Sequence, residues 1–228
     1  ELSNTVWAYA TAQVYRSNLF EEVATAAIQR KSDFNSHGIA SLLWSYAKMG
    51  FTDKQLFLSF EPTAAKLVDD CNNQDIANIA WAYAVADVDA APLFNDVFIK
   101  KCVKKKNAFK YEELTQLHQW HLWQTKEKSN AGLPQDLLGR SYKAFISEDP
   151  SVSKLQDDVV SQITSIGLDP QEEVLMESGY RMDALVEMNG ITIGVEVDGP
   201  SHFIGRRRSP TGSTILKRRQ VPAIDGIE

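Results

Sequence analysis

The chain has 228 residues, of which 43% are hydrophobic and 24% are charged, so it is long enough for one large or two small folded domains. Its formal net charge is −6, with 24 Lys and Arg residues against 30 Asp and Glu residues, which argues against a uniformly basic nucleic-acid-binding protein. No apolar run reaches the roughly 18 residues of a membrane span, and we expect no membrane partner.

A repeat of 37 residues runs through the first part of the chain. Tryptophans recur at this interval, as do the tyrosines and alanines shortly after them and the Leu-Phe pairs twelve residues after them. The positions are Trp7, Trp44 and Trp81; Tyr9, Tyr46 and Tyr83; Ala10, Ala47 and Ala84; and Leu19-Phe20, Leu56-Phe57 and Leu93-Phe94. So many positions in phase, without an insertion, indicate an internal structural repeat.

Each repeat predicts a pair of helices. The first helix, as in "SLLWSYA" and "NIAWAYA", is apolar on nearly every side, and the second begins near the Leu-Phe pair and is amphipathic. Because an all-round apolar helix must be buried, the pattern predicts an α-solenoid over residues 1–128, with its tryptophans buried between repeats. A fourth copy, "LTQLHQWHLW", has His118 at the tryptophan position, as an end repeat would. The first repeat begins within the pattern, so we expect further repeats upstream.

A polar residue stands three positions before each tryptophan: Asn4, Ser41 and Asn78. A hydrogen-bonding side chain in register on every first helix could read RNA bases, one nucleotide per repeat. The alternative is a hydrogen bond to a neighbouring helix. The aromatic stripe likewise favours a core over a base-stacking platform.

Two cysteines, Cys71 and Cys102, stand far apart, with no CxxC pair and no histidine at ligand spacing. We predict buried, reduced thiols and neither a disulfide nor a zinc site.

Three clusters of cations interrupt the acidic composition. Adjacent cations suit a phosphate backbone because their binding releases counterions, so these clusters are candidate RNA contacts, and a solvated charged surface is the alternative. The candidates are Lys100, Lys101, Lys104, Lys105 and Lys106; Arg206, Arg207 and Arg208; and Lys217, Arg218 and Arg219.

The pattern changes after Lys128. The polar stretch "SNAGLPQD" predicts a linker over residues 129–150 that holds a short helix at about 136–147. The segment "SVSKLQDDVVSQITSIG" then predicts a helix with a serine cap. Turns at Ser178-Gly179 and Asn189-Gly190 predict a three-stranded antiparallel meander, followed by a helix that contains "STILKRRQV". Residues 151–228 are therefore expected to form a small α/β domain.

Acidic residues gather at one end of this predicted sheet. Asp183 falls on the second strand, and Glu196 and Asp198 fall on one face of the third strand, in "GVEVDGPSHF". Three such carboxylates could bind Mg²⁺, which can activate water for phosphodiester cleavage, and His202 could act as an acid or a base. The alternative is a tight turn in which Asp198 binds backbone amides and His202 packs beneath it.

"GYRMDALVEMNGITIGVEVDGPSHF", followed by "TGSTILKRRQV", closely resembles the RAP domain, which is named for its abundance in apicomplexan parasites. The match covers about residues 153–221. The 37-residue units resemble the helical repeats that precede RAP domains, relatives of the octotricopeptide and FAST-kinase-like proteins. The resemblance implies a helical-repeat solenoid followed by a restriction-endonuclease-like α/β domain of the PD-(D/E)XK type, nearest to very-short-patch repair. A RAP domain normally ends in a further strand, so "VPAIDGIE" implies a shortened domain or a divergent remnant of that strand.

The resemblance implies a mitochondrial protein, or alternatively a plastid one, that acts in RNA processing, stability, translation or ribosome assembly. Its partners would be a ribosomal, messenger or transfer-RNA precursor and other proteins of an organelle ribonucleoprotein. Two alternatives stay open: a metal-dependent endoribonuclease, and a structural subunit of a large assembly such as a mitochondrial ribosome.

By this resemblance Asp183 and Glu196 match the two acids of the nuclease motif, whereas its lysine would stand where this chain has Asp198. The departure removes the cation beside the attacking water, and we predict a nuclease-like scaffold without efficient catalysis. In the short-patch branch an aspartate and a nearby histidine replace that lysine, a role that would fall to Asp198 and His202. Mg²⁺ is expected only if the nuclease alternative holds.

Overall fold

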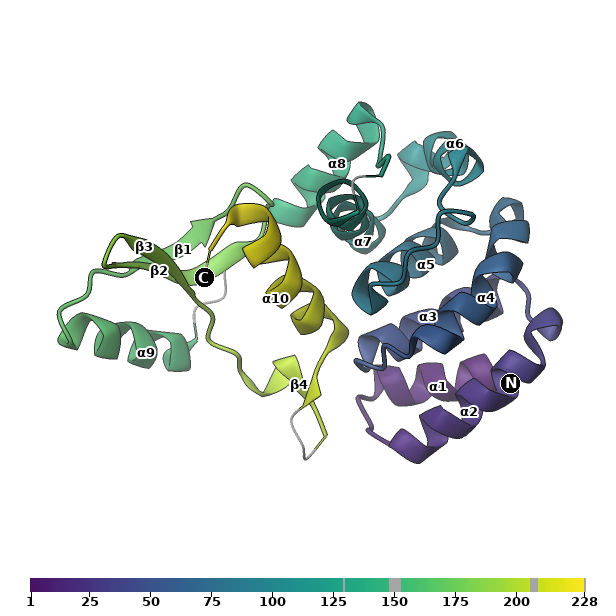
Figure 1. Cartoon of the computed structure of the whole chain (residues 1–228), viewed down its shortest axis with the longest axis horizontal. Helices are drawn as coiled ribbons and strands as arrows, with labels where there is room; N and C mark the ends of the chain where they lie inside the picture. Colours follow the sequence, from purple (N-terminus) through teal and green to yellow (C-terminus); the bar gives the residue numbers. More distant parts are fainter. Residues whose placement is uncertain (129, 148–152, 206–208, 228) are drawn as a thin grey trace.

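The computed structural model describes residues 1–128, 130–147, 153–205 and 209–227. The protein is mostly helical, with a small antiparallel sheet near its C-terminal end (Figure 1). Within these residues, no helix combines the length and apolarity needed to cross a membrane.

The position that holds tryptophan in the first three repeats, and His118 in the fourth, lies on four helices. These helices pack side by side in chain order, and we call them the inner helices. They are α1 (Leu2–Thr11), α3 (Ser36–Lys48), α5 (Asn73–Ala86) and α7 (Tyr111–Leu122). Their partners in the repeat are α2 (Ser17–Gln29), α4 (Lys54–Lys66) and α6 (Asp96–Lys105). Figure 1 shows α4 and α6 farther from the last helix, α10 (Gly212–Asp225), than α3 and α5 are. Short 3-10 turns follow at Lys31–Asp33, Val68–Asp70 and Lys106–Ala108.

Two inner helices begin with the same capping chemistry. The side chain of Asn35 accepts a hydrogen bond from the amide of Gly38 at 2.8 Å, and that of Asn72 accepts one from the amide of Asp75 at 2.9 Å. Each bond satisfies an amide that the first helical turn leaves without a partner. Asn35 and Asn72 are themselves one repeat interval apart, so the interval sets where these helices start.

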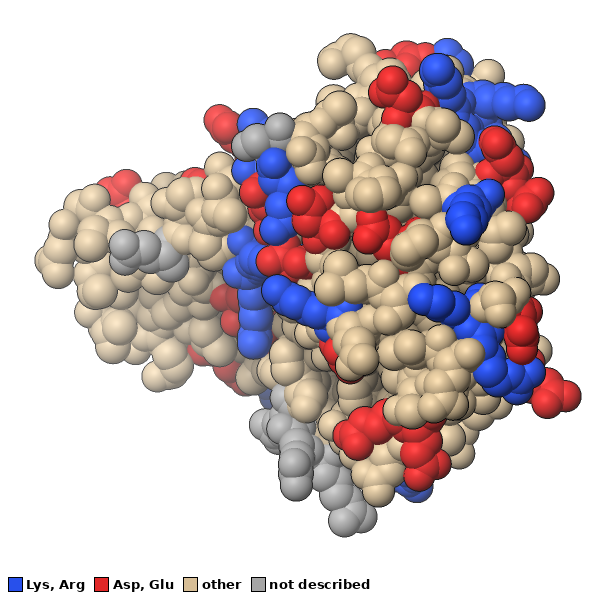
Figure 2. Space-filling model, turned by 45° about the vertical axis from the view of Figure 1, so that its right-hand side comes forward, with Lys and Arg blue, Asp and Glu red and all other residues tan. Residues whose placement is uncertain are grey.

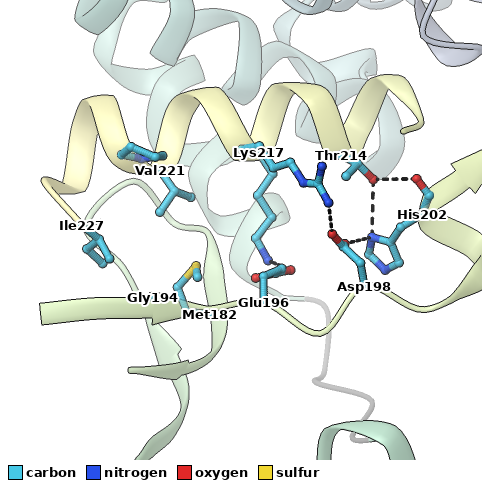
Figure 3. Close-up of a pocket in the computed structure, with 11 residues that line it drawn as sticks. Met182, Gly194, Glu196, Asp198, His202, Thr214, Lys217, Val221 and Ile227 are labelled. Atoms are coloured by element: carbon cyan, nitrogen blue, oxygen red, sulfur yellow. Dashed lines mark hydrogen bonds and ion pairs between the residues drawn. The ribbon is translucent and has the colours of Figure 1, made fainter. Parts of the chain in front are cut away.

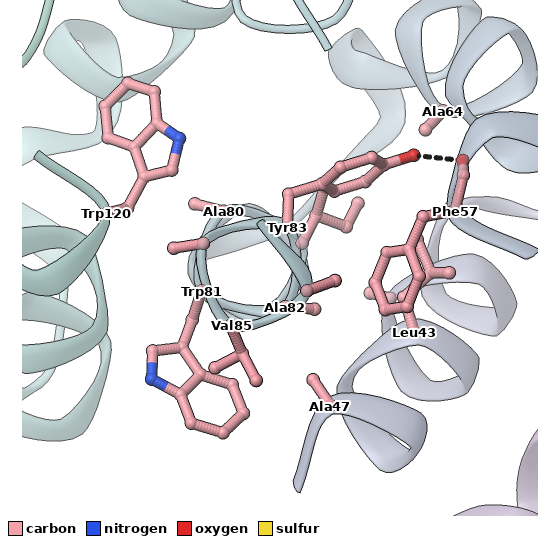
Figure 4. Packing of buried hydrophobic residues seen from close by; sticks show 14 of the residues in the cluster. Leu43, Ala47, Phe57, Ala64, Ala80, Trp81, Ala82, Tyr83, Val85 and Trp120 are labelled. Carbon is pink, nitrogen blue, oxygen red and sulfur yellow. Dashed lines mark hydrogen bonds between the residues drawn. The ribbon is translucent and has the colours of Figure 1, made fainter. Parts of the chain in front are cut away.

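The repeat also preserves one buried tertiary hydrogen bond. The hydroxyl of Tyr46 donates to the carbonyl oxygen of Phe20, and that of Tyr83 donates to the carbonyl oxygen of Phe57 at 2.8 Å (Figure 4). Donor and acceptor both shift by one repeat. In the fourth copy the buried Trp120 takes the tyrosine position, and its ring centroid lies 5.2 Å from that of Phe94. The sequence interval therefore corresponds to a repeated contact.

The prediction that all three tryptophans are buried between repeats is wrong for Trp7 and only partly met for Trp44. Trp81 is buried, and its Nε1 donates to Oε1 of Gln119 at 2.9 Å, whereas Trp44 is half-buried and Trp7 is 46% exposed. Burial of Trp81 comes in part from Gly212, which lies against its ring. The tryptophan position of the repeat thus lies at the edge of the layer of inner helices, and the burial of each tryptophan depends on which residues cover that edge.

The elements of the predicted linker and of the residues after it follow the predicted order. They are α8 (Gln135–Ile146), α9 (Lys154–Ser165), β1 (Gln171–Leu175), β2 (Arg181–Met188) and β3 (Ile191–Val195), and α9 is capped by Ser153 as expected. The strands form an antiparallel meander in the order β1-β2-β3. Asn189 and Gly190 have φ angles of 55° and 80°, the left-handed values that a tight turn between twisted strands requires.

Helix α10 (Gly212–Asp225) lies between the sheet and the inner helices, and α9 lies on another side of the sheet (Figure 1). The suggestion that "VPAIDGIE" holds a strand remnant is wrong within the described residues, because α10 continues to Asp225. A 3-10 turn (Pro200–His202) and a short pair of strands, β4 (Phe203–Ile204) and β5 (Ser209–Pro210), precede α10 and were not predicted. We call the chain from α9 onward the C-terminal segment.

A buried polar network fixes the C-terminal segment to the inner helices. Gln119 of α7 donates to the hydroxyl of Tyr180, which donates to Gln220 of α10 at 2.9 Å. Gln220 in turn donates to the backbone oxygen of Gln119 at 2.9 Å. Polar groups removed from water are costly unless paired, so this closed set of bonds defines one docking arrangement.

Candidate functional site

The three carboxylates lie near one another, but only Asp183 is on a strand as predicted. Asp183 is on β2, whereas β3 ends at Val195, so Glu196 and Asp198 lie beyond the strand. The physical reason involves Asp183, whose Oδ2 accepts a hydrogen bond from the amide of Val197 at 2.6 Å. The Val197 amide is thus bonded to a side-chain oxygen of β2 and not to a backbone carbonyl of that strand, and β3 leaves the sheet at this point.

Glu196 pairs with Lys217 of α10 (Figure 3). The Lys217 ammonium also donates to the backbone oxygen of Arg181 at 2.7 Å. Burial raises the pKa of Glu196, and the positive charge of Lys217 opposes that rise. Its second oxygen, Oε2, is buried and has no hydrogen-bond partner in the described part of the chain.

Asp198 has two side-chain partners. It forms an ion pair with Arg218 of α10, and Nδ1 of His202 lies 2.9 Å from its Oδ1 (Figure 3). His202 is held near Thr214, whose hydroxyl donates to its backbone oxygen at 3.2 Å. The histidine therefore points into the carboxylate cluster, and the described contacts of Asp198 are with side chains and not with the backbone amides of the alternative.

The cluster does not have the form of a magnesium site in this arrangement. A divalent cation needs several oxygens directed at one point, whereas Asp183, Glu196 and Asp198 are directed at an amide, an ammonium and a guanidinium. No group of three His, Cys, Asp or Glu residues suited to a metal occurs in residues 1–128, 130–147, 153–205 and 209–227. The arrangement is a charge-balanced ion-pair network.

Two cavities flank the pair of Glu196 and Lys217. The smaller, of about 160 Å³, extends under α10 toward Met182 and Val221 (Figure 3). The larger, of about 500 Å³, extends on the side of Asp183. Both are also lined by His202, so this histidine and Lys217 present an imidazole and a cation to two cavities that are open to the surface.

The cations of α10 all have partners within the chain. Beside the two pairs above, Arg219 donates to the backbone oxygens of Ala84 and Val85, at the C-terminal end of α5, and pairs with Glu127 at 2.7 Å. A guanidinium in this position satisfies carbonyls that the last helical turn leaves without partners. RNA binding through Lys217, Arg218 or Arg219 would require these contacts to be exchanged.

The five candidate lysines between positions 100 and 106 lie on α6 or directly after it. Lys106 pairs with Asp136, and Lys101 donates to the backbone oxygen of Asp69. Lys100 and Lys104 are exposed and Lys105 is half-buried. Arg206, Arg207 and Arg208 lie outside the described residues. On the face drawn in Figure 2, Lys and Arg are interspersed with Asp and Glu.

The polar register residues differ in their surroundings. Asn4 is exposed and Ser41 is buried, whereas Asn78 is half-buried and accepts a hydrogen bond from Nε2 of Gln116 at 3.1 Å. For Asn78, the structure thus has the bond to a neighbouring helix that was the alternative to base reading. The interval alone could not distinguish these cases.

The sequence analysis did not single out Lys48, the last residue of α3, as a candidate site residue. Its ammonium lies 4.8 Å from the ring centroid of Trp44. The missed signal was the spacing, because a lysine four residues after a tryptophan shares its face of a helix.

None of the known protein-family models matches this chain.

Proposed function

We propose that this chain is an organelle RNA-binding protein, mitochondrial or alternatively of plastids, in which a solenoid of 37-residue repeats and a RAP-like domain together hold single-stranded RNA. The ribosomal, messenger or transfer-RNA precursor it binds would be processed, stabilised, translated or assembled into a ribonucleoprotein. The RAP resemblance of residues 153–221 and the repeat resemblance supply the organelle and the RNA class.

One observation carries the proposal: the tryptophans at the repeated position of two neighbouring inner helices, α1 and α3, are not fully buried. Trp7 is 46% exposed, Trp44 is half-buried with the ammonium of Lys48 over its ring, and Asn4 is exposed on the same helix as Trp7. Indole rings stack on bases of any sequence, and a nearby cation pairs with the backbone, which is how single strands are held. The repeated bond from tyrosine to phenylalanine carbonyl supports regular stacking of the helix pairs.

The test is equilibrium binding of fluorescein-labelled single-stranded RNA, with the corresponding duplex as competitor. We expect binding that weakens with salt, and a loss of affinity when Trp7 and Trp44 are both replaced by alanine. Leu58→Ala is the matched control, because Leu58 is 51% exposed on α4, outside the inner helices. Equal affinity of the double variant and the control would mean that RNA bases do not stack on Trp7 and Trp44. No binding by the wild type would favour the alternative of a structural subunit held by protein contacts.

A nuclease remains the second candidate because of one specific contact. Lys217 places an ammonium beside Glu196, which is the kind of charge that Asp198 fails to supply at the motif position. We nevertheless infer inefficient cleavage, because each carboxylate is bound to another group. The test is hydrolysis of single-stranded and structured RNA with Mg²⁺ or Mn²⁺ by the wild type, Asp183→Ala and His202→Ala. Cleavage by the wild type alone would establish the nuclease in place of the scaffold.

A further inference from the structure

A small pocket lies where the C-terminal segment meets the inner helices. Its volume is about 100 Å³, and both parts of the chain line it. The lining includes Gln13, Lys48 and Trp81 from the helical part and Ser201, Thr211 and Ser213 from the C-terminal segment. The pocket therefore exists only when the two parts are docked.

Close backbone contacts hold the two sides of this pocket together. Gly205 lies against the ring of Tyr15, and Gly50 lies against the backbone oxygen of Pro210. Both glycines have φ near 66°, a left-handed value that other residues rarely adopt. A side-chain carbon at Gly50 would lie 2.6 Å from the Pro210 oxygen, so the approach depends on glycine.

Among the described residues that line the pocket, Lys48 is the cation, and none carries a carboxylate that balances its charge. Its side chain is half-buried, and it forms no ion pair with a carboxylate of the described residues. Burial lowers the pKa of Lys48, with no acidic residue acting on it. This contrasts with Lys217, Arg218 and Arg219 of the C-terminal segment, which are all paired. A partly desolvated cation without a counter-charge favours the binding of an anion.

The neighbouring groups suit a nucleotide. The hydroxyls of Ser201 and Ser213 are exposed neutral donors at the same pocket, as phosphate oxygens require. The ammonium of Lys48 lies over one face of the Trp44 indole, 4.8 Å from the ring centroid, and the indole remains partly exposed. A base that stacks on the opposite face would have its phosphate within reach of the cation. No carboxylate is among the described residues that line this pocket.

We propose that this junction pocket binds one backbone phosphate of single-stranded RNA, with Lys48 as its cation and Trp44 stacking on the adjacent base. The inference rests on the proposed RNA-binding function and assigns it a position. Ser201 also lines the larger cavity beside Asp183 and Glu196, so a strand held at Lys48 continues toward the carboxylate cluster.

The experiment measures binding of a fluorescein-labelled oligouridine of about 12 nucleotides to the full chain over a salt series. Lys48→Gln is expected to weaken binding about tenfold and to reduce the slope of log affinity against log salt by about 0.7, the value for one single-strand phosphate. Lys48→Arg keeps the charge and is expected to bind nearly as the wild type does. Lys54→Gln is the matched control, an exposed lysine at the start of α4, and is expected to change nothing.

A cross-linking experiment on the wild type locates the RNA independently of any variant. Oligouridine carrying 4-thiouridine should form adducts on peptides that contain Trp44, Lys48 or Ser201. If the wild type binds RNA, Lys48→Gln binds equally well and the adducts lie elsewhere, the pocket is not the site and the proposed function stands. If the wild type binds no RNA, both proposals fail.

Discussion

At the scale of single residues, two cations of α10 neutralise the acidic cluster: Lys217 pairs with Glu196 and Arg218 pairs with Asp198. Asp183, Glu196 and Asp198 were expected at one end of the sheet, and they lie there. That Lys217 and Arg218 would neutralise them could not be predicted, because contacts between a helix and a distant loop leave no periodic signal. The same holds for Trp81, whose burial depends in part on Gly212 of α10.

Replacing Lys217 by methionine should destabilise the protein at neutral pH by about 2–3 kcal/mol, because it leaves the partly buried Glu196 without a counter-charge. Burial raises the folded-state pKa of Glu196, and without the ammonium that pKa rises further. The loss of stability in the variant is therefore largest at pH values above the Glu196 pKa of the variant. It shrinks as the pH falls and Glu196 becomes protonated. Denaturant unfolding at several pH values measures it.

Arg218→Met provides the control for this change. Arg218 pairs with Asp198 but its side chain is 52% exposed, so its removal should cost below about 1 kcal/mol. Equal costs for the two variants would contradict the assignment of Lys217 as the buried partner.

His121 should make stability depend on pH. Burial lowers its pKa from 6.5 to about 4, and its Nδ1 accepts a hydrogen bond from the amide of Leu133 at 3.0 Å. Since the unfolded chain binds the proton first, the stabilisation is full above pH 6.5 and is lost as the pH falls toward 4. Between about pH 7.5 and pH 5 the loss should be about 2 kcal/mol for this residue.

His121→Gln removes this titration, and its pH dependence should be flatter than that of the wild type by close to that amount. Burial also lowers the pKa of His118, so a part of the slope remains in the variant. Parallel pH profiles for wild type and variant would show that His121 titrates alike in the folded and unfolded states.

At the scale of elements, the repeat interval predicted the helix pairs but not every boundary. Leu93-Phe94 was expected near the start of a helix, as in the two earlier repeats. Instead α6 begins at Asp96, because the side chain of Asn95 accepts from the amide of Val97 at 2.8 Å and caps the helix there. The turns of the meander were predictable because Asn189-Gly190 has a specific backbone requirement. The strands β4 and β5 were not, since two residues carry no pattern.

The repeated tyrosine hydrogen bond gives a prediction that only a structural repeat makes. Tyr46→Phe and Tyr83→Phe should each destabilise the protein by about 1–2 kcal/mol, because each leaves a buried carbonyl oxygen without its donor. Tyr9→Phe is the control, since the Tyr9 hydroxyl makes no hydrogen bond within the described residues, and should cost little. Chemical denaturation measures all three, and clearly unequal costs for Tyr46 and Tyr83 would contradict equivalent positions.

At the scale of the whole molecule, the sequence predicted two folded units and a linker but not their docking. The cluster of buried apolar residues in the C-terminal segment is small and includes Leu122 of α7. A small core supplies little stability by itself, so the segment depends on its contacts with the inner helices. Those contacts are both polar and apolar. Arg219 donates to the last carbonyls of α5 and Gln220 donates to Gln119, while Ile204 and Leu216 are buried in the main apolar core.

Gly212 provides the sharpest test of this dependence. A side-chain carbon at Gly212 would lie 2.1 Å from the backbone oxygen of Ala47, so even Gly212→Ala should push α10 away from α3. Gly139→Ala is the matched control, because Gly139 is in α8 with no atom near its missing side chain, and it should stabilise the helix by about 0.5–1 kcal/mol.

Tryptophan fluorescence and far-ultraviolet circular dichroism are followed together during unfolding. In the wild type the two transitions should coincide, as for one cooperative body. In Gly212→Ala we expect Trp81 to become exposed first and the transitions to separate, because the contact that covers its ring is the one disrupted. Coincident transitions at wild-type stability would mean that α10 docks without this close approach.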